Sequence, residues 1–71
     1  MEDQVRKIIA GILVIDVAGL TLATNITAIE SWDSMAQVRI VAELEDAFSC
    51  SIPIERINSL RKVGDFVSVI S

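Results

Sequence analysis

The sequence predicts an all-α domain of three main helices and one short helix, packed around an aliphatic core. Apolar residues recur at helical spacing in three segments of the chain. The single proline stands between the second and the last of these segments, where it can open a short helix. Hydrophobic residues make up 52% of the chain and aromatic residues only 4%, so the core must consist of Ile, Val, Leu and Ala. With 71 residues the chain has room for one domain, over residues 1–71.

The first helix is predicted from about Glu2 to Ile15. Glu2 and Asp3 stand near its N-terminus, where the helix dipole favours carboxylates. Residues at i, i+3, i+4, i+7 and i+8 are apolar and are expected to form one buried face: Val5, Ile8, Ile9, Ile12 and Leu13.

The stretch from Asp16 to Asp33 is predicted to be a long loop, because its periodicity is weak and Gly, Thr and Asn interrupt it. Thr27, followed by Glu30, is in position to cap a single helical turn within this loop. Four apolar side chains are expected to pin the loop to the core: Leu20, Leu22, Ile26 and Ile29.

The second helix is the clearest element, from about Ser34 to Phe48, with Asp33 as its N-cap. At ~100° per residue, one side of this helix faces the core and carries Ile40, Val41, Leu44 and Phe48. The nearly opposite side carries Met35, Val38 and Ala42, with Arg39 at its border. Apolar residues on that side indicate either scattered surface residues or a docking face for a partner.

The second helix is predicted to end at Ser49–Ser51, and Pro53 then suits the first turn of a short third helix, with Glu55 beside its N-terminus. A fourth helix to the C-terminus is predicted from apolar residues at i, i+3, i+4 and i+7: Val63, Phe66, Val67 and Ile70.

Composition excludes several classes of function. The absence of histidine removes His-based catalytic and metal sites, and the one cysteine, Cys50, cannot form an internal disulfide. The net charge of -4 argues against binding of nucleic acid, which requires a basic face. The chain is therefore not expected to be an enzyme, but a module on which other proteins act.

The stretch from Ile8 to Ile29 contains a single charge, Asp16, and has the length of a membrane span. Asp16 lies near its middle, where an ionised carboxylate is costly in lipid. We therefore expect no membrane insertion. A free cysteine suits the reducing cytoplasm, and the protein is expected to be a cytoplasmic monomer.

Ser34 has two interpretations. Serine is common at a helix start because its hydroxyl can accept a hydrogen bond from a free backbone N–H group. The same N–H groups and the positive helix end also favour a phosphate attached to this serine. A serine hydrolase is excluded, because the chain has no histidine and its only lysines are Lys7 and Lys62.

The segment Trp32-Asp33-Ser34-Met35 resembles the Asp-Ser-Leu motif of acyl carrier proteins, with Met in place of Leu. The motif opens a helix after a long loop, as in that family. The resemblance covers essentially all 71 residues and continues through Val38, Ile40-Val41, Leu44-Glu45-Asp46, Phe48, Ile52-Pro53 and Val63-Gly64-Asp65-Phe66-Val67.

This resemblance implies a four-helix acyl-carrier-like bundle. It implies that a phosphopantetheinyl transferase, using coenzyme A and magnesium, attaches 4′-phosphopantetheine to Ser34, and that the arm carries acyl groups as thioesters between acyl-loading and acyl-transfer enzymes. Asp33 would then assist positioning at the modification site. Partner enzymes would contact the exposed side of the second helix, namely Met35, Val38, Arg39 and Ala42.

Several residues depart from the acidic pattern of carriers that serve fatty-acid synthesis. Ala36 and Arg39 stand where that pattern has acidic residues, as do Ile54 and Arg56. These changes predict a specialised stand-alone carrier of fatty-acid, polyketide or related biosynthesis, since charge complementarity largely sets partner choice. An aminoacyl or peptidyl carrier and an unmodified helical interaction domain remain as alternatives. An aliphatic core can also open around a short acyl chain, but the residue pattern does not specify a cavity.

Overall fold

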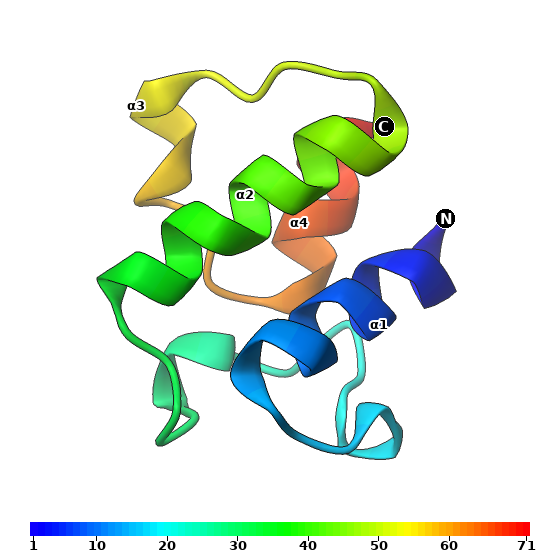
Figure 1. Cartoon of the computed structure of the whole chain (residues 1–71), viewed down its shortest axis with the longest axis vertical. Coiled ribbons are helices and arrows are strands. Elements are labelled where there is room, and N and C mark those ends of the chain that lie inside the picture. The colour runs from blue at the N-terminus through cyan, green and yellow to red at the C-terminus, as the bar shows by residue number, and fades with distance from the viewer.

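The computed structural model describes all 71 residues as helices joined by loops. The elements follow in the order α1 (Glu2–Leu13), η1 (Val17–Gly19), η2 (Ile26–Ala28), α2 (Ser34–Phe48), α3 (Ile54–Ile57) and α4 (Val63–Ile70). Here η1 and η2 are single 3-10 turns. In Figure 1, α2 crosses the molecule, and it packs against α1, α3 and α4. The prediction of three main helices and one short helix is confirmed. None of the helices combines the length and the apolar character needed to cross a membrane.

The core is aliphatic, as predicted, with Phe66 of α4 as its one fully buried aromatic residue. Val5, Ile9 and Leu13 of α1 are buried, whereas Ile8 and Ile12 on the edges of the predicted face are half-buried. From α2 the core receives Ile40, Val41 and Leu44, and Phe48 is half-buried at its margin. On α4, Val63 and Phe66 are buried, while Val67 and Ile70 are half-buried.

The first helix ends earlier than predicted, at Leu13 rather than Ile15. Val14 turns into the left-handed region with φ of 56°, and the Ile15 N–H then donates to the Ala10 carbonyl at 3.0 Å. A β-branched residue is costly in this conformation, so local residue preferences did not predict the turn. The second helix ends the same way, at Ser49 with φ of 49°.

Two features of the long loop differ from the prediction. Its second turn, η2, is capped by Asn25, whose Oδ1 accepts from the Thr27 N–H at 3.0 Å, and not by Thr27. Leu20 and Ile26 are buried and Ile29 is half-buried as expected, but the Leu22 side chain is 42% exposed.

Leu22 anchors the loop through its backbone instead. The Gly64 N–H donates to the Leu22 carbonyl at 2.9 Å, and a Cβ on Gly64 would lie 3.1 Å from that oxygen. The Val63 N–H donates to Thr24 at 3.0 Å and the Ile26 N–H to Arg61 at 2.8 Å. These three hydrogen bonds hold the loop against the start of α4.

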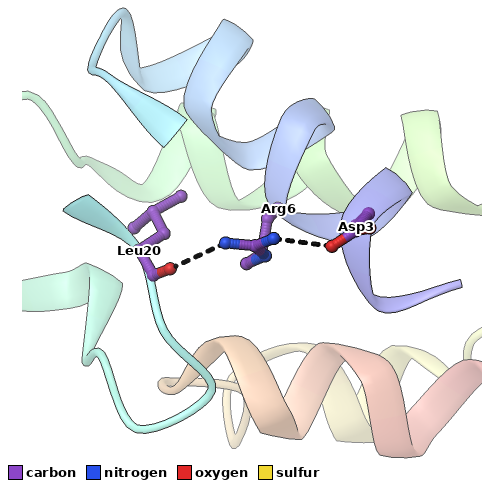
Figure 2. A network of polar contacts seen from close by, with 3 residues as sticks. All are labelled: Asp3, Arg6 and Leu20. Atoms are coloured by element: carbon purple, nitrogen blue, oxygen red, sulfur yellow. Dashed lines mark hydrogen bonds and ion pairs between the residues drawn. The ribbon is translucent and has the colours of Figure 1, made fainter. Parts of the chain in front are cut away.

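Arg6 joins α1 to the beginning of the same loop, as Figure 2 shows. Its Nη1 donates to the Leu20 carbonyl at 3.2 Å, and its Nη2 pairs with Asp3 at 2.6 Å. The hydrogen bond from Arg6 holds the pKa of the Asp3 carboxyl below its ordinary value. This is the only ion pair within the chain, so the other basic side chains have no acidic partner.

Asp65 stabilises the start of α4 in a pH-dependent way. Its Oδ2 accepts from the backbone N–H groups of Lys62 at 2.9 Å and Arg61 at 3.1 Å, which lowers the pKa of the carboxyl below its ordinary value. Because the folded pKa is lowered, this stability is complete above the ordinary aspartate pKa of about 3.9 and is lost as pH falls through the folded value.

Asp65→Asn is therefore expected to lower the free energy of unfolding at pH 7 by on the order of 1 kcal/mol, because the asparagine oxygen still accepts these hydrogen bonds but lacks the charge that strengthens them. The difference from the unaltered protein should shrink below about pH 4. Urea unfolding across this pH range measures it. Asp46→Asn is the control, since Asp46 is exposed on α2 and its carboxylate accepts no hydrogen bond. A difference that stays constant with pH would contradict the assignment.

Candidate functional site

The candidate site lies at the N-terminus of α2, where the chain turns out of the long loop. Asp33 has extended backbone angles, and its Oδ1 accepts from the Ala36 N–H at 2.7 Å, so the predicted N-cap is confirmed. The Gln37 N–H donates to the Asp33 carbonyl at 3.1 Å and completes the first turn. The backbone N–H groups of Ser34 and Met35 have no partner in the chain. This end of α2 therefore presents free donors together with the positive end of the helix dipole.

Ser34 is the first residue of α2, and its side chain is exposed. Its hydroxyl makes no hydrogen bond within the chain, since the capping bond comes from Asp33. The interpretation of Ser34 as a capping residue is therefore wrong. The hydroxyl is open to a partner, and a phosphate attached to it would lie beside the free N–H groups of the first turn.

The side of α2 that was considered as a docking face is exposed, as its helical spacing predicted. Met35 and Val38 are 72% and 59% exposed, and Arg39 and Ala42 are exposed beside them. These four residues are spaced i, i+3, i+4 and i+7, so they share one side of α2. Ile54, the first residue of α3, is 81% exposed and adds a large apolar side chain that the sequence analysis did not assign to a docking face.

A pocket of about 140 Å³ opens next to Ser34. Ser34, Gln37 and Val38 of α2 form one wall of the pocket, and Thr27 and Trp32 of the loop contribute to it. The rest of the lining comes from α3 and the segment after it, through Ile57, Asn58, Leu60 and Arg61. The residue pattern did not specify this pocket, because its walls come from three segments that only the fold brings together.

Gln37 is the one buried polar side chain, with 4% of its surface exposed, and every polar group of its amide is bonded. Its Nε2 donates to the carbonyls of Ile57 and Leu60, each at 2.8 Å, and its Oε1 accepts from Trp32 Nε1 at 2.9 Å. We name these three hydrogen bonds the Gln37 strap. They tie the loop and α3 to α2. Leaving such a buried group unbonded costs about 1–3 kcal/mol.

Sequence reasoning missed the Gln37 strap. No role was assigned to Gln37 from the sequence, yet its angle of ~300° from Ser34 places it among the core-facing residues. A polar residue on a core face is a signal for a buried hydrogen-bonding role. Trp32 is half-buried and packs on the core, as an indole closing the loop would.

Comparison with known proteins gives a consistent result. The model of the phosphopantetheine attachment site family matches residues 3–70. The acyl carrier protein of Streptococcus pneumoniae is 34% identical over 68 residues, which cover 96% of this chain and 88% of that protein. The acyl carrier protein of Lactobacillus acidophilus is 31% identical over 68 residues, 96% of this chain and 85% of that protein. A probable acyl carrier protein of Caulobacter vibrioides is 44% identical over 39 residues, 55% of this chain and 45% of that protein.

The fold agrees with these sequence matches. The solution structure of a holo acyl carrier protein from Geobacter metallireducens superposes with a TM-score of 0.81, covering 97% of this chain and 79% of that one at 23% identity. The all-α acyl-carrier-like bundle is therefore confirmed. The family match, which spans nearly the whole chain, makes 4′-phosphopantetheine the cofactor, and the exposed serine beside free N–H groups fits a phosphate-linked arm. The chain belongs to the acyl carrier protein family.

Proposed function

We propose that Ser34 is the attachment residue of the 4′-phosphopantetheine arm. The observation that carries this proposal is the exposed Ser34 hydroxyl, which has no partner in the chain and stands at the Asp33-capped start of α2. In the attachment step, Ser34 Oγ forms a bond to the phosphorus of the phosphopantetheine half of coenzyme A. The pyrophosphate P–O bond breaks, adenosine 3′,5′-bisphosphate leaves, and the hydroxyl proton passes to a base of the phosphopantetheinyl transferase.

The chain's own residues have three tasks in this proposal. The Asp33 carboxylate fixes the first turn through the Ala36 N–H and so sets the direction in which Ser34 points. The free N–H groups of Ser34 and Met35 stabilise the attached phosphate. When bound, the cofactor supplies a thiol that holds an acyl group as a thioester. The chain itself is proposed to carry the group and to catalyse no step.

The attachment step is tested by intact mass. The protein is incubated with coenzyme A, magnesium and a permissive phosphopantetheinyl transferase. We expect the mass to rise by one phosphopantetheine group per chain. An unchanged mass would favour the alternative in which the Met35/Val38/Ala42 side of α2 makes a simple helical interaction domain. The arm's cargo, read from the mass of protein purified from its own cells, separates an acyl carrier from an aminoacyl or peptidyl carrier.

We propose that partner enzymes dock on the exposed side of α2, through Met35, Val38, Arg39 and Ala42. The exposed apolar side chains support this role, since a contiguous apolar patch is typical of a protein-binding surface. Arg39 has no acidic partner within the chain, so its charge faces outward. Arg56, Arg61 and Lys62 are exposed as well and make no ion pair.

These basic residues support a specialised carrier, since charge complementarity largely sets partner choice. We propose that the protein acts in fatty-acid, polyketide or related biosynthesis, as a monomer in the cytoplasm. Arg39→Glu is therefore expected to improve acyl transfer by enzymes of fatty-acid synthesis. The expected gain in kcat/KM is about fivefold at most, because exposed charge pairs contribute up to about 1 kcal/mol.

Steady-state transfer assays with a fatty-acid-synthase acyltransferase measure this gain. Lys7→Glu is the matched control, since Lys7 is exposed on α1 and the change in net charge is the same. A gain confined to Arg39→Glu supports docking at α2. No gain, a loss, or an equal gain in both variants would contradict it.

A further inference from the structure

The pocket beside Ser34 is closed toward the core by the Gln37 strap. The Gln37 amide donates both of its protons, to the carbonyls of Ile57 and Leu60. Its oxygen accepts from Trp32 Nε1. The Ile57 carbonyl ends α3 and otherwise accepts only a long hydrogen bond, from the Leu60 N–H at 3.4 Å. The strap ties this carbonyl, and that of Leu60 in the following segment, to α2.

The size of the pocket limits what can enter without moving α3. Its volume of about 140 Å³ is similar to that of a cavity of about 150 Å³ that holds one benzene molecule. A group of about six carbon atoms therefore fits. To shelter further carbon atoms, the chain would have to pass between α2 and α3, which would break the hydrogen bonds to Ile57 and Leu60 and leave a buried amide without partners.

We propose that Gln37 is a specificity-determining residue that restricts the acyl group sheltered by this protein to a short one. The occupant of the pocket is the acyl group on the arm of Ser34, because Ser34 itself lines the pocket. This inference rests on the proposed attachment at Ser34. Short acyl groups lie in the pocket with the strap intact, and longer chains remain in solvent beyond it.

The test compares arms of increasing acyl length. Butyryl, hexanoyl, octanoyl and decanoyl arms are loaded from the corresponding acyl-coenzyme A by a permissive transferase, and intact mass verifies loading. The Tm of each form is compared with that of the protein carrying the arm alone. We expect a rise on the order of 5 °C by hexanoyl, and no further rise with octanoyl or decanoyl.

Gln37→Ala removes the strap and enlarges the pocket, so the rise in Tm should continue through decanoyl. Gln37→Met keeps the length of the side chain and removes the hydrogen bonds. It replaces Gln37→Ala in the same Tm comparison if the alanine variant does not fold. Gln4→Ala is the control, because Gln4 is an exposed glutamine of α1 that lies outside the pocket. It should keep the length limit of the unaltered protein.

The outcomes separate this inference from the proposed function. Absence of any mass increase overturns the attachment at Ser34 and the inference with it. If loading succeeds, a Tm that rises steadily through decanoyl in the unaltered protein overturns the role of Gln37 alone. The role of Gln37 is also overturned if the Tm of Gln37→Ala, or of Gln37→Met in its place, stops rising at hexanoyl as in the unaltered protein. It is overturned as well if no acyl length changes the Tm. Hydrogen exchange of the backbone N–H groups of α3 gives an independent readout of the same length limit. We expect butyryl and hexanoyl arms to slow this exchange, and octanoyl and decanoyl arms not to slow it further.

Discussion

Ser34→Ala is expected to abolish attachment of the phosphopantetheine arm completely and to leave the fold unchanged. Loss is complete because the substitution removes the oxygen atom that forms the new bond. The fold is unaffected because the Ser34 hydroxyl is exposed and makes no hydrogen bond, while Asp33 holds the start of α2. Intact mass after incubation with coenzyme A and a transferase measures attachment, and circular dichroism measures helix content and Tm.

Ser68→Ala is the matched control for this substitution. Ser68 is an exposed serine on α4 whose hydroxyl also makes no hydrogen bond. This variant should gain the arm as fully as the unaltered protein does. An arm on Ser34→Ala would place the attachment at another residue and would contradict the proposed role of Ser34.

The largest effect on stability is expected for Phe66→Ala. Phe66 is fully buried at the centre of the core, and truncation of a buried Phe typically costs about 3–5 kcal/mol. Small domains have total stabilities near the lower end of about 5–15 kcal/mol, so the variant should be partly unfolded near body temperature. Urea unfolding monitored by circular dichroism gives the free energy of unfolding.

Phe48→Ala is the same substitution at a phenylalanine that is less deeply buried than Phe66. Phe48 is half-buried at the C-terminal end of α2 and only borders the core. Its truncation should cost clearly less than that of Phe66, because less apolar surface returns to water. Equal losses for the two variants would show that Phe66 is not the centre of the core.

Local signals predicted the helices well wherever the chain supplied its own caps and faces. The bounds of α2 follow from Asp33 and from the apolar side that carries Ile40 and Leu44, and the structure has the same bounds. The end of α1 was wrong by two residues, because Val14 adopts a left-handed conformation that β-branched residues rarely enter. Nothing in its neighbours specifies that turn.

Contacts between distant segments could not be predicted in the same way. The side chain of Leu22 was expected in the core, but its carbonyl makes the anchoring contact, to Gly64. The Gln37 strap joins residues from the loop, α2 and α3, and no local pattern pairs an amide with a particular carbonyl. Burial of Gln37 was not predicted, although its position lies on the core side of α2, and only the fold identified its partners.

The candidate site itself was found in two steps of different kinds. Periodicity placed Met35 and Val38 on an exposed side of α2, and the structure confirms that exposure. Ser34 could not be separated from a capping serine by physical reasoning on the sequence, so its assignment depended on the resemblance of the whole chain to a family. The structure then removed the capping alternative, because Asp33 occupies that role.

The most direct test of the central claim is fragment mass spectrometry of the modified protein. Peptides that span the end of the loop and the start of α2 contain two serines, Ser31 and Ser34, and fragmentation distinguishes them. Ser31 donates its hydroxyl to the Leu13 carbonyl at 2.7 Å, whereas the Ser34 hydroxyl is free. We predict a single phosphopantetheine on Ser34. An arm on Ser31 or on any other residue, or no arm after complete reaction with coenzyme A, would contradict this account.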